Sequence, residues 1–164
     1  MIKVVNLHRH VQIKSSLKKQ RVDPEDKSLE NKHFSVGALI KRGNKYLIIN
    51  RNIYPQGYAG IAGHIKKNEK PIEALKREVK EETNYDLMSE KLLFHEIIKG
   101  NECRSGIKIH EWYLYECICK GKLKITKREE KSIQYLTKEE INKFYKQRKL
   151  EPVWEYWFEK LKLI

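Results

Sequence analysis

The segment Pro71–Thr83 constrains the fold more than any other part of the chain. Pro71 suits the first position of an α-helix. Ile72, Leu75 and Val79 recur at helical spacing and form an apolar stripe. We therefore expect a helix over this segment that packs its apolar stripe against a core.

Three glutamates of this expected helix fall on one arc of its surface, beside the apolar stripe: Glu78, Glu81 and Glu82. Like charges at this spacing repel, and carboxylates in the last turns oppose the helix dipole. A hard divalent cation would offset both costs, because Mg²⁺ prefers oxygen ligands and is commonly shared with substrate phosphates. Taken alone, the glutamates also fit a solvated helix face with interspersed lysines.

The spacing of the residues on either side of these glutamates favours a metal site over a solvated helix face. Gly63 is followed after five residues by Glu69, and after seven more by an Arg-Glu pair and a Glu-Glu pair. This pattern resembles the Nudix signature, G-x5-E-x7-R-E-U-x-E-E-x-G-U, where U is a bulky apolar residue. The resemblance to the signature spans Gly63–Tyr85 and departs from it at Asn84, which replaces the last glycine. That position ends a helix and is not a ligand position, so the departure concerns a helix cap.

Alternating apolar and polar residues on either side of this segment predict strands. Thr137, with Glu140 three residues on, is a capping-box signature for a further helix that runs to about residue 148. Strands are expected over 34–41, 46–50, 92–99, 107–119, 122–125 and 132–136, and a last helix over 152–163.

This order of elements favours the α+β class, with helices packed on a mixed sheet. The resemblance implies the Nudix fold, an α/β/α sandwich with a central mixed β-sheet. Residues 1–164 are expected to form a single Nudix domain with its core at about 33–150. Residues 1–32 are expected to be a polar N-terminal extension, and 152–163 a C-terminal helix.

The resemblance also implies roles for the residues of the signature. Glu78, Glu81 and Glu82 would bind Mg²⁺, for which Mn²⁺ can substitute, together with a backbone carbonyl such as that of Gly63. Glu69 and Arg77, at their positions in the signature, would pair and hold the loop to the helix, because an arginine–carboxylate fork is geometrically demanding.

The catalytic base is less well specified by the pattern. Family members often recruit another glutamate from a loop after the long strand, and Glu129 fits that offset from Tyr135. An exposed loop charge explains Glu129 equally well. Glu82, Glu81 and Glu129 therefore remain the candidates for taking a proton from a metal-activated water.

Aromatic residues near the expected cleft are candidates for stacking on a base: Tyr54, Tyr58 and Trp112, with Tyr113 beside the last. Base–aromatic stacking contributes about 1–3 kcal/mol. Trp112 and Tyr113 equally fit opposite faces of one strand, with one of them in the core. Ala62-Gly63-His64 is also somewhat similar to the isoprenoid-isomerase branch of the fold, but no convincing counterpart of that branch's catalytic cysteine is found.

Composition narrows the functional classes. The net charge is +13 and the pI about 9.6, which favours phosphate-bearing partners. The sequence has no signal-like N-terminus and no membrane-length apolar stretch, and Cys117 and Cys119 fit packing positions of one strand. We therefore expect a cytoplasmic protein with a reducing environment and no membrane partner.

Three functions remain open after these arguments. The first is a pyrophosphohydrolase that acts on a nucleotide or nucleotide derivative, including nucleoside triphosphates. The second is removal of diphosphate from the 5′ end or cap of RNA, which the +13 charge favours. The third is a Nudix-fold nucleotide- or RNA-binding regulator without turnover, which the complete set of signature glutamates disfavours.

Overall fold

The computed structural model describes residues 31–124 and 130–164. The strands in these residues are β1 (His33–Arg42), β2 (Lys45–Arg51), β3 (Gly57–Ala59), β4 (Ile61–His64), β5 (Asp86–Lys99), β6 (Ile109–Lys120) and β7 (Glu130–Thr137). The helices are α2 (Pro71–Thr83), α3 (Lys138–Lys146) and α4 (Pro152–Lys160).

Strand β1 joins the two groups of strands in the sheet. It runs parallel to β6, with His33 opposite His110, and antiparallel to β4, with Ser35 opposite His64. β5 pairs antiparallel with the other edge of β6. At its far end β1 turns back into β2, which also pairs with β3 and β7. The result is a mixed sheet in which β4, β1, β6 and β5 lie side by side.

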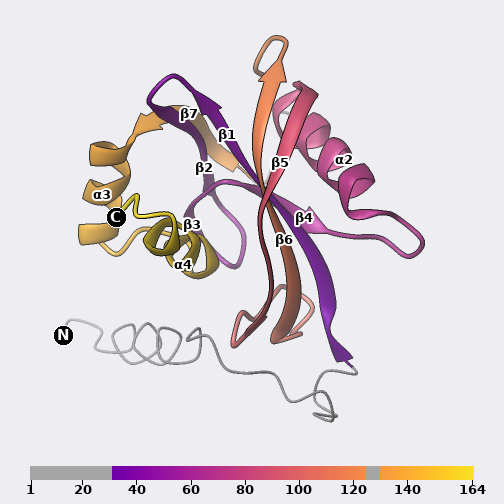
Figure 1. The fold of residues 1–164 in the computed structure, drawn as a ribbon. Coiled ribbons are helices and arrows are strands. Elements are labelled where there is room, and N and C mark those ends of the chain that lie inside the picture. Colours follow the sequence, from indigo (N-terminus) through magenta and orange to yellow (C-terminus); the bar gives the residue numbers. More distant parts are fainter. Residues whose placement is uncertain (1–30, 125–129) are drawn as a thin grey trace, which may run out of the picture.

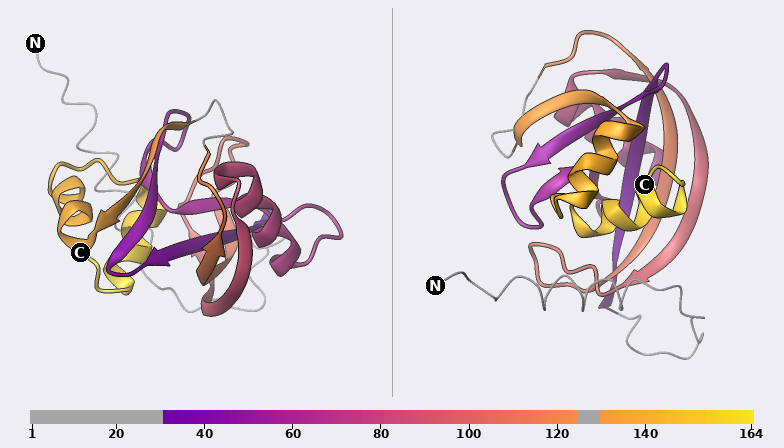
Figure 2. Two further views of the ribbon diagram at one scale, coloured as in Figure 1. Left: turned by 90° about the horizontal axis from the view of Figure 1, so that it is seen from above. Right: turned by 90° about the vertical axis from the view of Figure 1, so that its left-hand side faces the viewer.

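The helices lie on two sides of these strands (Figures 1 and 2). α2 contacts β4, β1 and β5, whereas α4 contacts β3 and α3 contacts β7. The layers therefore form an α/β/α sandwich with a central mixed sheet, as the sequence predicts. Within the described residues, no helix is long and apolar enough to cross a membrane.

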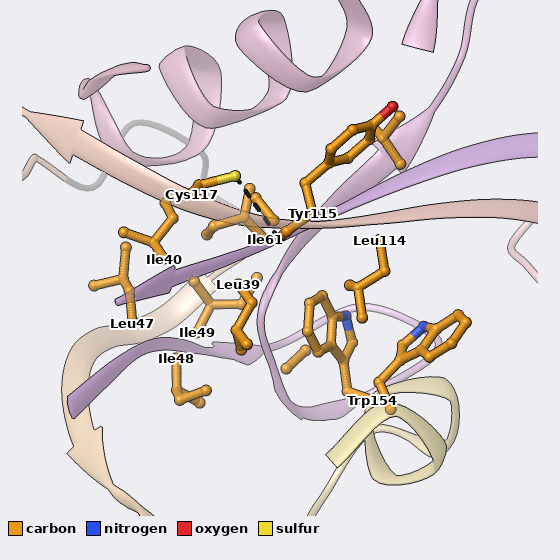
Figure 3. Close-up of a cluster of buried hydrophobic side chains, with 14 of the residues drawn as sticks. Leu39, Ile40, Leu47, Ile48, Ile49, Ile61, Leu114, Tyr115, Cys117 and Trp154 are labelled. Carbon is orange, nitrogen blue, oxygen red and sulfur yellow. Dashed lines mark hydrogen bonds between the residues drawn. The ribbon is translucent and has the colours of Figure 1, made fainter. Parts of the chain in front are cut away.

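The core lies between the sheet and the helices (Figure 3). Trp154 and Trp157 of α4 are almost completely buried. A Cβ at Gly60 would lie only 2.3 Å from the Trp154 ring, and one at Gly37 would meet the same ring at 3.4 Å. Glycine at these two positions lets the indole approach the backbone, which seats α4 directly on the strands.

Most of the predicted elements are present with shifted ends. The helix over Pro71–Thr83 has the predicted bounds, and Asn84 has a φ of 62°, the predicted left-handed cap. The Thr137 capping box is also confirmed. β5 begins at Asp86, six residues earlier than expected, and α4 ends at Lys160.

The predicted strand over 122–125 is wrong for the residues of it that the structure describes. Residues 122–124 form no strand, and residue 125 lies outside the described residues. The chain there follows the positive φ of Gly121, and Lys124 donates a backbone hydrogen bond to the Thr83 carbonyl at the end of α2. The segment therefore covers a helix end instead of extending the sheet. The expected N-terminal extension over 1–32 falls almost entirely outside the described residues.

Candidate active site

The end of β4 touches the acidic face of α2 at Gly63. A Cβ built on Gly63 would lie 2.0 Å from the carboxyl carbon of Glu78, far inside van der Waals contact. Any side chain at this position would displace the Glu78 carboxylate. The glycine therefore lets this carboxylate lie against the β4 backbone, beside the carbonyl groups that the sequence predicts as further metal ligands.

Arg77 holds this arrangement in place. Its Nε and Nη2 donate to the two carboxylate oxygens of Glu69 at 2.7 and 2.9 Å, and Nη2 also donates to the His64 carbonyl at 2.9 Å. Glu69 in turn accepts a hydrogen bond from the Lys66 backbone N–H at 2.8 Å. The predicted pairing of Glu69 with Arg77 is therefore present, and it ties the loop after β4 to α2.

The electrostatics of this pair agree with its geometry. The hydrogen bonds from Arg77 lower the pKa of Glu69 to about 2, and they outweigh the desolvation that acts in the opposite direction. The same contact raises the pKa of Arg77, with Glu78 contributing after Glu69. Arg77 also donates through Nη1 to Glu78 and lies 3.7 Å from the Glu81 carboxylate. Glu69 and Arg77 are therefore both charged across the ordinary pH range.

The three glutamates predicted as metal ligands lie together on α2 but differ in exposure. Glu78 and Glu82 are 6% and 5% exposed, one helical turn apart, and the Glu81 side chain is 43% exposed. Carboxylates buried at this spacing repel one another. Their oxygens, together with the adjoining Gly63 backbone, make the hard donor set that Mg²⁺ or Mn²⁺ requires. The residues present therefore fit the metal that the sequence implies.

A cleft of about 210 Å³ adjoins this region on the other face of β4. Gly63 and His64 form one part of its wall, and Tyr54, Trp112 and Arg51 contribute other parts. Arg51 and Arg104 bring positive charge to the lining. The cleft is therefore suited to a ligand that carries both a flat ring and phosphate groups.

The aromatic candidates divide between the cleft and the core. Tyr54 lines the cleft and is 49% exposed. Trp112 also lines it but is only 5% exposed, while Tyr113 is half-buried on the opposite side of the strand. Tyr58 is not among the lining residues, since its ring stacks on Phe144 with 3.7 Å between centroids. One face of the Tyr58 ring is therefore used for packing, and its suggested stacking on a substrate base stays a prediction from the sequence.

Two further predictions concern Glu129 and the two cysteines of β6. Glu129 lies outside the described residues, so its suggested catalytic role stays a prediction from the sequence. Cys117 is fully buried and Cys119 half-buried on the same strand, and both have free thiols, as expected for packing residues.

Sequence reasoning missed a cluster beside the cleft: His33, His64, Cys103 and His110. Their ligand atoms all lie within 4.8 Å of one another. Burial, reinforced by His64 and His33, lowers the pKa of His110 to about 4. Burial also lowers the pKa of His64, with His33 the next contributor. The four residues come from three separate parts of the chain, so a motif search by spacing does not find them.

Comparison with known proteins agrees with this geometry. The family model described as "NUDIX domain" matches residues 31–158, which is most of the chain. No curated protein matches the chain by sequence.

Solved structures with the same fold are numerous but distant in sequence. A NUDIX hydrolase from Nitrosomonas europaea superposes with a TM-score of 0.67 at 20% identity, covering 80% of this chain and 89% of that one. The MutT NUDIX hydrolase from Burkholderia pseudomallei has a TM-score of 0.60 at 18% identity, with 67% and 86% covered. The NUDIX domain of Shewanella oneidensis NrtR, complexed with ADP ribose, has a TM-score of 0.65 at 14% identity, with 87% and 92% covered. At these identities the similarity concerns the fold.

Proposed function

The chain belongs to the Nudix family, and on that premise we propose that it is a Mg²⁺-dependent pyrophosphohydrolase. Its substrate would be a nucleoside diphosphate derivative or a nucleoside triphosphate, cleaved at the diphosphate linkage. The proposal includes a single domain over the whole chain, with Glu78, Glu81 and Glu82 as the metal ligands.

The contact between Gly63 and Glu78 is the observation that carries the proposal. A buried carboxylate pressed against a strand backbone is costly unless a cation or donor group compensates it. Arg77 supplies one positive charge to Glu78, and Glu82 adds a second buried carboxylate one turn further along. A divalent cation bound by these oxygens would add two positive charges to this acidic cluster, and it would lower the pKa of a bound water.

Other steps of the reaction would depend on orienting residues and on a proton acceptor. Glu69 and Arg77 orient the loop and the helix, because the bidentate fork fixes their relative position. Glu81, the most exposed of the three glutamates, and Glu82 are the candidates in the described residues for accepting a proton from the attacking water. Glu129 stays a third candidate on its sequence position.

The cleft supports a nucleotide-type substrate. Arg51 and Arg104 in its lining favour phosphate oxygens, and the exposed Tyr54 ring offers a stacking surface. The NrtR domain, which shares this fold, binds ADP ribose in its solved structure. We therefore rank a nucleoside diphosphate linked to a second moiety first among the substrates.

Two alternatives rest on separate observations. A net charge of +13 favours a polyanion such as the 5′ end of RNA, whose binding would weaken steeply with salt. A nucleotide- or RNA-binding regulator without turnover would use the same cleft, but it would not require the buried glutamates of α2.

A phosphate-release screen tests the proposed activity. ADP ribose, nucleoside triphosphates and 5′-triphosphorylated RNA are incubated with the protein, with and without Mg²⁺ or Mn²⁺. Inorganic pyrophosphatase is added to convert released diphosphate to phosphate, and a phosphomonoesterase is added for ADP ribose, whose cleavage yields two phosphate monoesters. We expect metal-dependent cleavage of at least one of the small nucleotides, weakly dependent on salt, and loss of kcat by at least about 100-fold in Glu82→Gln and Glu81→Gln.

Glu73→Gln is the matched control, because it changes the same residue type on the same helix. Glu73 accepts a hydrogen bond from the Lys70 backbone N–H, which a glutamine oxygen also accepts. Its activity should remain within a few-fold of wild type. If no substrate is cleaved while ligands bind, the regulator alternative is favoured. Full activity in the Glu82 and Glu81 variants would overturn the site assignment.

A further inference from the structure

We propose that His33, His64, Cys103 and His110 form a second, zinc-type metal site, which ties the loop between β5 and β6 to the central sheet. Its donor atoms all lie within 4.8 Å of one another. Three imidazole nitrogens and one thiolate sulfur are ligand types that Zn²⁺ takes, and four of them complete a tetrahedral site. Neither the proposed hydrolase activity nor the glutamates on α2 enter into the assignment of this site.

The sheet register brings the histidines together. His33 on β1 lies opposite His110 on the parallel strand β6. Two residues on, Ser35 lies opposite His64 on the antiparallel strand β4. Because paired residues share a face and alternate residues along a strand point the same way, all three imidazoles lie on one face. Three adjacent strands therefore supply three donors at the same end of the sheet.

Cys103 completes the set from the loop. Its backbone N–H bonds to the Ile107 carbonyl, and its carbonyl accepts from the Gly106 N–H, so a tight turn positions the thiol. The sulfur lies 3.6 Å from Nδ1 of His33. In a tetrahedral Zn²⁺ site, Zn–N and Zn–S bonds place neighbouring donors about 3.3–3.6 Å apart. The observed separation matches this spacing.

The three imidazole rings lie against one another. His64 and His110 are stacked with 5.5 Å between centroids, and His33 meets the His64 ring edge-on at 4.7 Å. His110 is 1% exposed, and neither ring nitrogen makes a hydrogen bond of normal geometry with a described residue. Buried imidazole nitrogens without partners are costly, and coordination to a metal satisfies one of them.

The two proposed metal sites differ in place and in donor chemistry. Gly63 faces Glu78 and α2, and His64, the next residue of β4, points to the opposite face. The glutamates offer hard oxygen donors, which suit Mg²⁺, while the histidine–cysteine cluster offers nitrogen and sulfur, which suit Zn²⁺. The two ions should therefore not compete for one site.

The expected consequence is an ordered wall of the cleft. Asn101, Cys103 and Arg104 all belong to the loop between β5 and β6 and all line the cleft. In Figure 1 this loop lies at the lower end of the two long strands. A metal bound at Cys103 joins it to β1, β4 and β6, so that the lining keeps one conformation.

Metal content and cobalt spectroscopy test the site. The full chain is stripped with a chelator, dialysed, and titrated with Zn²⁺ or Co²⁺ in the presence of millimolar Mg²⁺. We expect one Zn²⁺ per chain retained after gel filtration. Co²⁺ should give the intense visible bands of a tetrahedral ion and a sulfur-to-metal charge-transfer band, while the thiol proton is released to solvent.

Variants of single ligands, with matched controls outside the cluster, separate loss of metal binding from a folding defect. Cys103→Ser should abolish the charge-transfer band and weaken Zn²⁺ binding at least 100-fold, and His33→Gln should weaken it similarly. Cys119→Ser is the matched control, since burial raises the pKa of Cys119 to about 11 and keeps that thiol protonated. His95→Gln, at an exposed histidine outside the cluster, is the second control.

Trypsin gives a readout of the loop itself. Arg104 is exposed in this loop, and cleavage after it should slow at least tenfold when Zn²⁺ is added to wild type. In Cys103→Ser the added Zn²⁺ should have no effect. The proposal is overturned if wild type retains no stoichiometric Zn²⁺, if Co²⁺ binds with weak octahedral bands, or if Cys103→Ser and His33→Gln bind as wild type does.

Discussion

Glu151 gives the sharpest test of the electrostatics around the cleft. It is 2% exposed and precedes α4, where one carboxylate oxygen accepts a hydrogen bond from the Trp154 backbone N–H at 3.0 Å. The other oxygen has no hydrogen-bond partner among the described residues. Burial raises the pKa of Glu151 to about 7, although Arg51 acts in the opposite direction. The folded protein therefore favours the protonated form.

The sign and size of the effect on stability follow from this difference. An unfolded glutamate has a pKa near 4.5, so the folded state holds the proton more tightly. The stabilisation by the protonated group is fully present below pH 4.5 and is lost as the pH rises through about 7. A pKa difference of this size corresponds to roughly 3 kcal/mol between these limits.

Glu151→Gln removes the ionisation and keeps an oxygen that can accept the Trp154 hydrogen bond. We expect the free energy of unfolding of wild type to fall by about 3 kcal/mol relative to this variant between pH 4.5 and pH 8. Chemical denaturation at several pH values measures it. Glu159→Gln, at an exposed position of the same helix, is the control and should show no such divergence. Parallel stability curves for wild type and Glu151→Gln would refute the reasoning.

Substitutions at three further positions test the signature segment. Gly63→Ala should lower kcat at least tenfold with little change in circular dichroism, because the new Cβ displaces the Glu78 carboxylate; unchanged kinetics would separate this contact from activity. Arg77→Lys should cost about 1–3 kcal/mol in denaturation, since a lysine cannot reproduce the fork to Glu69; equal stability would show that the fork is not needed. Asn84→Ala should cost about 1 kcal/mol, because its φ is 62° and its side-chain hydrogen bond is lost, whereas Asn84→Gly should cost less; the reverse order would contradict the cap argument.

Local features of the chain were predictable because they depend on near neighbours. The bounds of α2 follow from Pro71, the apolar spacing and the Asn84 cap, all within fourteen residues. The Glu69–Arg77 pair lies within the same short segment, so its geometry is limited by the loop that joins them. The geometry of the loop and of α2 could therefore be predicted from the sequence, while the metal-binding role of the glutamates stays a prediction.

Long-range features were not predictable from spacing. Tyr58 is one of several aromatic candidates for stacking on a base, and nothing in its sequence neighbourhood shows that Phe144 of α3 lies against its ring. The histidine–cysteine cluster depends on β1 pairing in parallel with β6, and a shift of one residue would turn its histidines to the other face. Periodicity predicts that strands exist, whereas their order and register depend on contacts between distant segments. These residues can be found only after the sheet is known.

The alternation of side chains along β4 would let one short segment contribute to both proposed metal sites. Its consecutive residues Gly63 and His64 point to opposite faces, and the absence of a side chain at the first is what admits Glu78. The His64 carbonyl accepts from Arg77, so the backbone of the histidine is held by the signature while its ring faces the other cluster. Loss of metal at the histidine–cysteine cluster should therefore loosen the cleft wall without removing the hard oxygen donors. In metal-stripped protein resupplied with Mg²⁺ alone, we expect KM to rise by a larger factor than kcat falls.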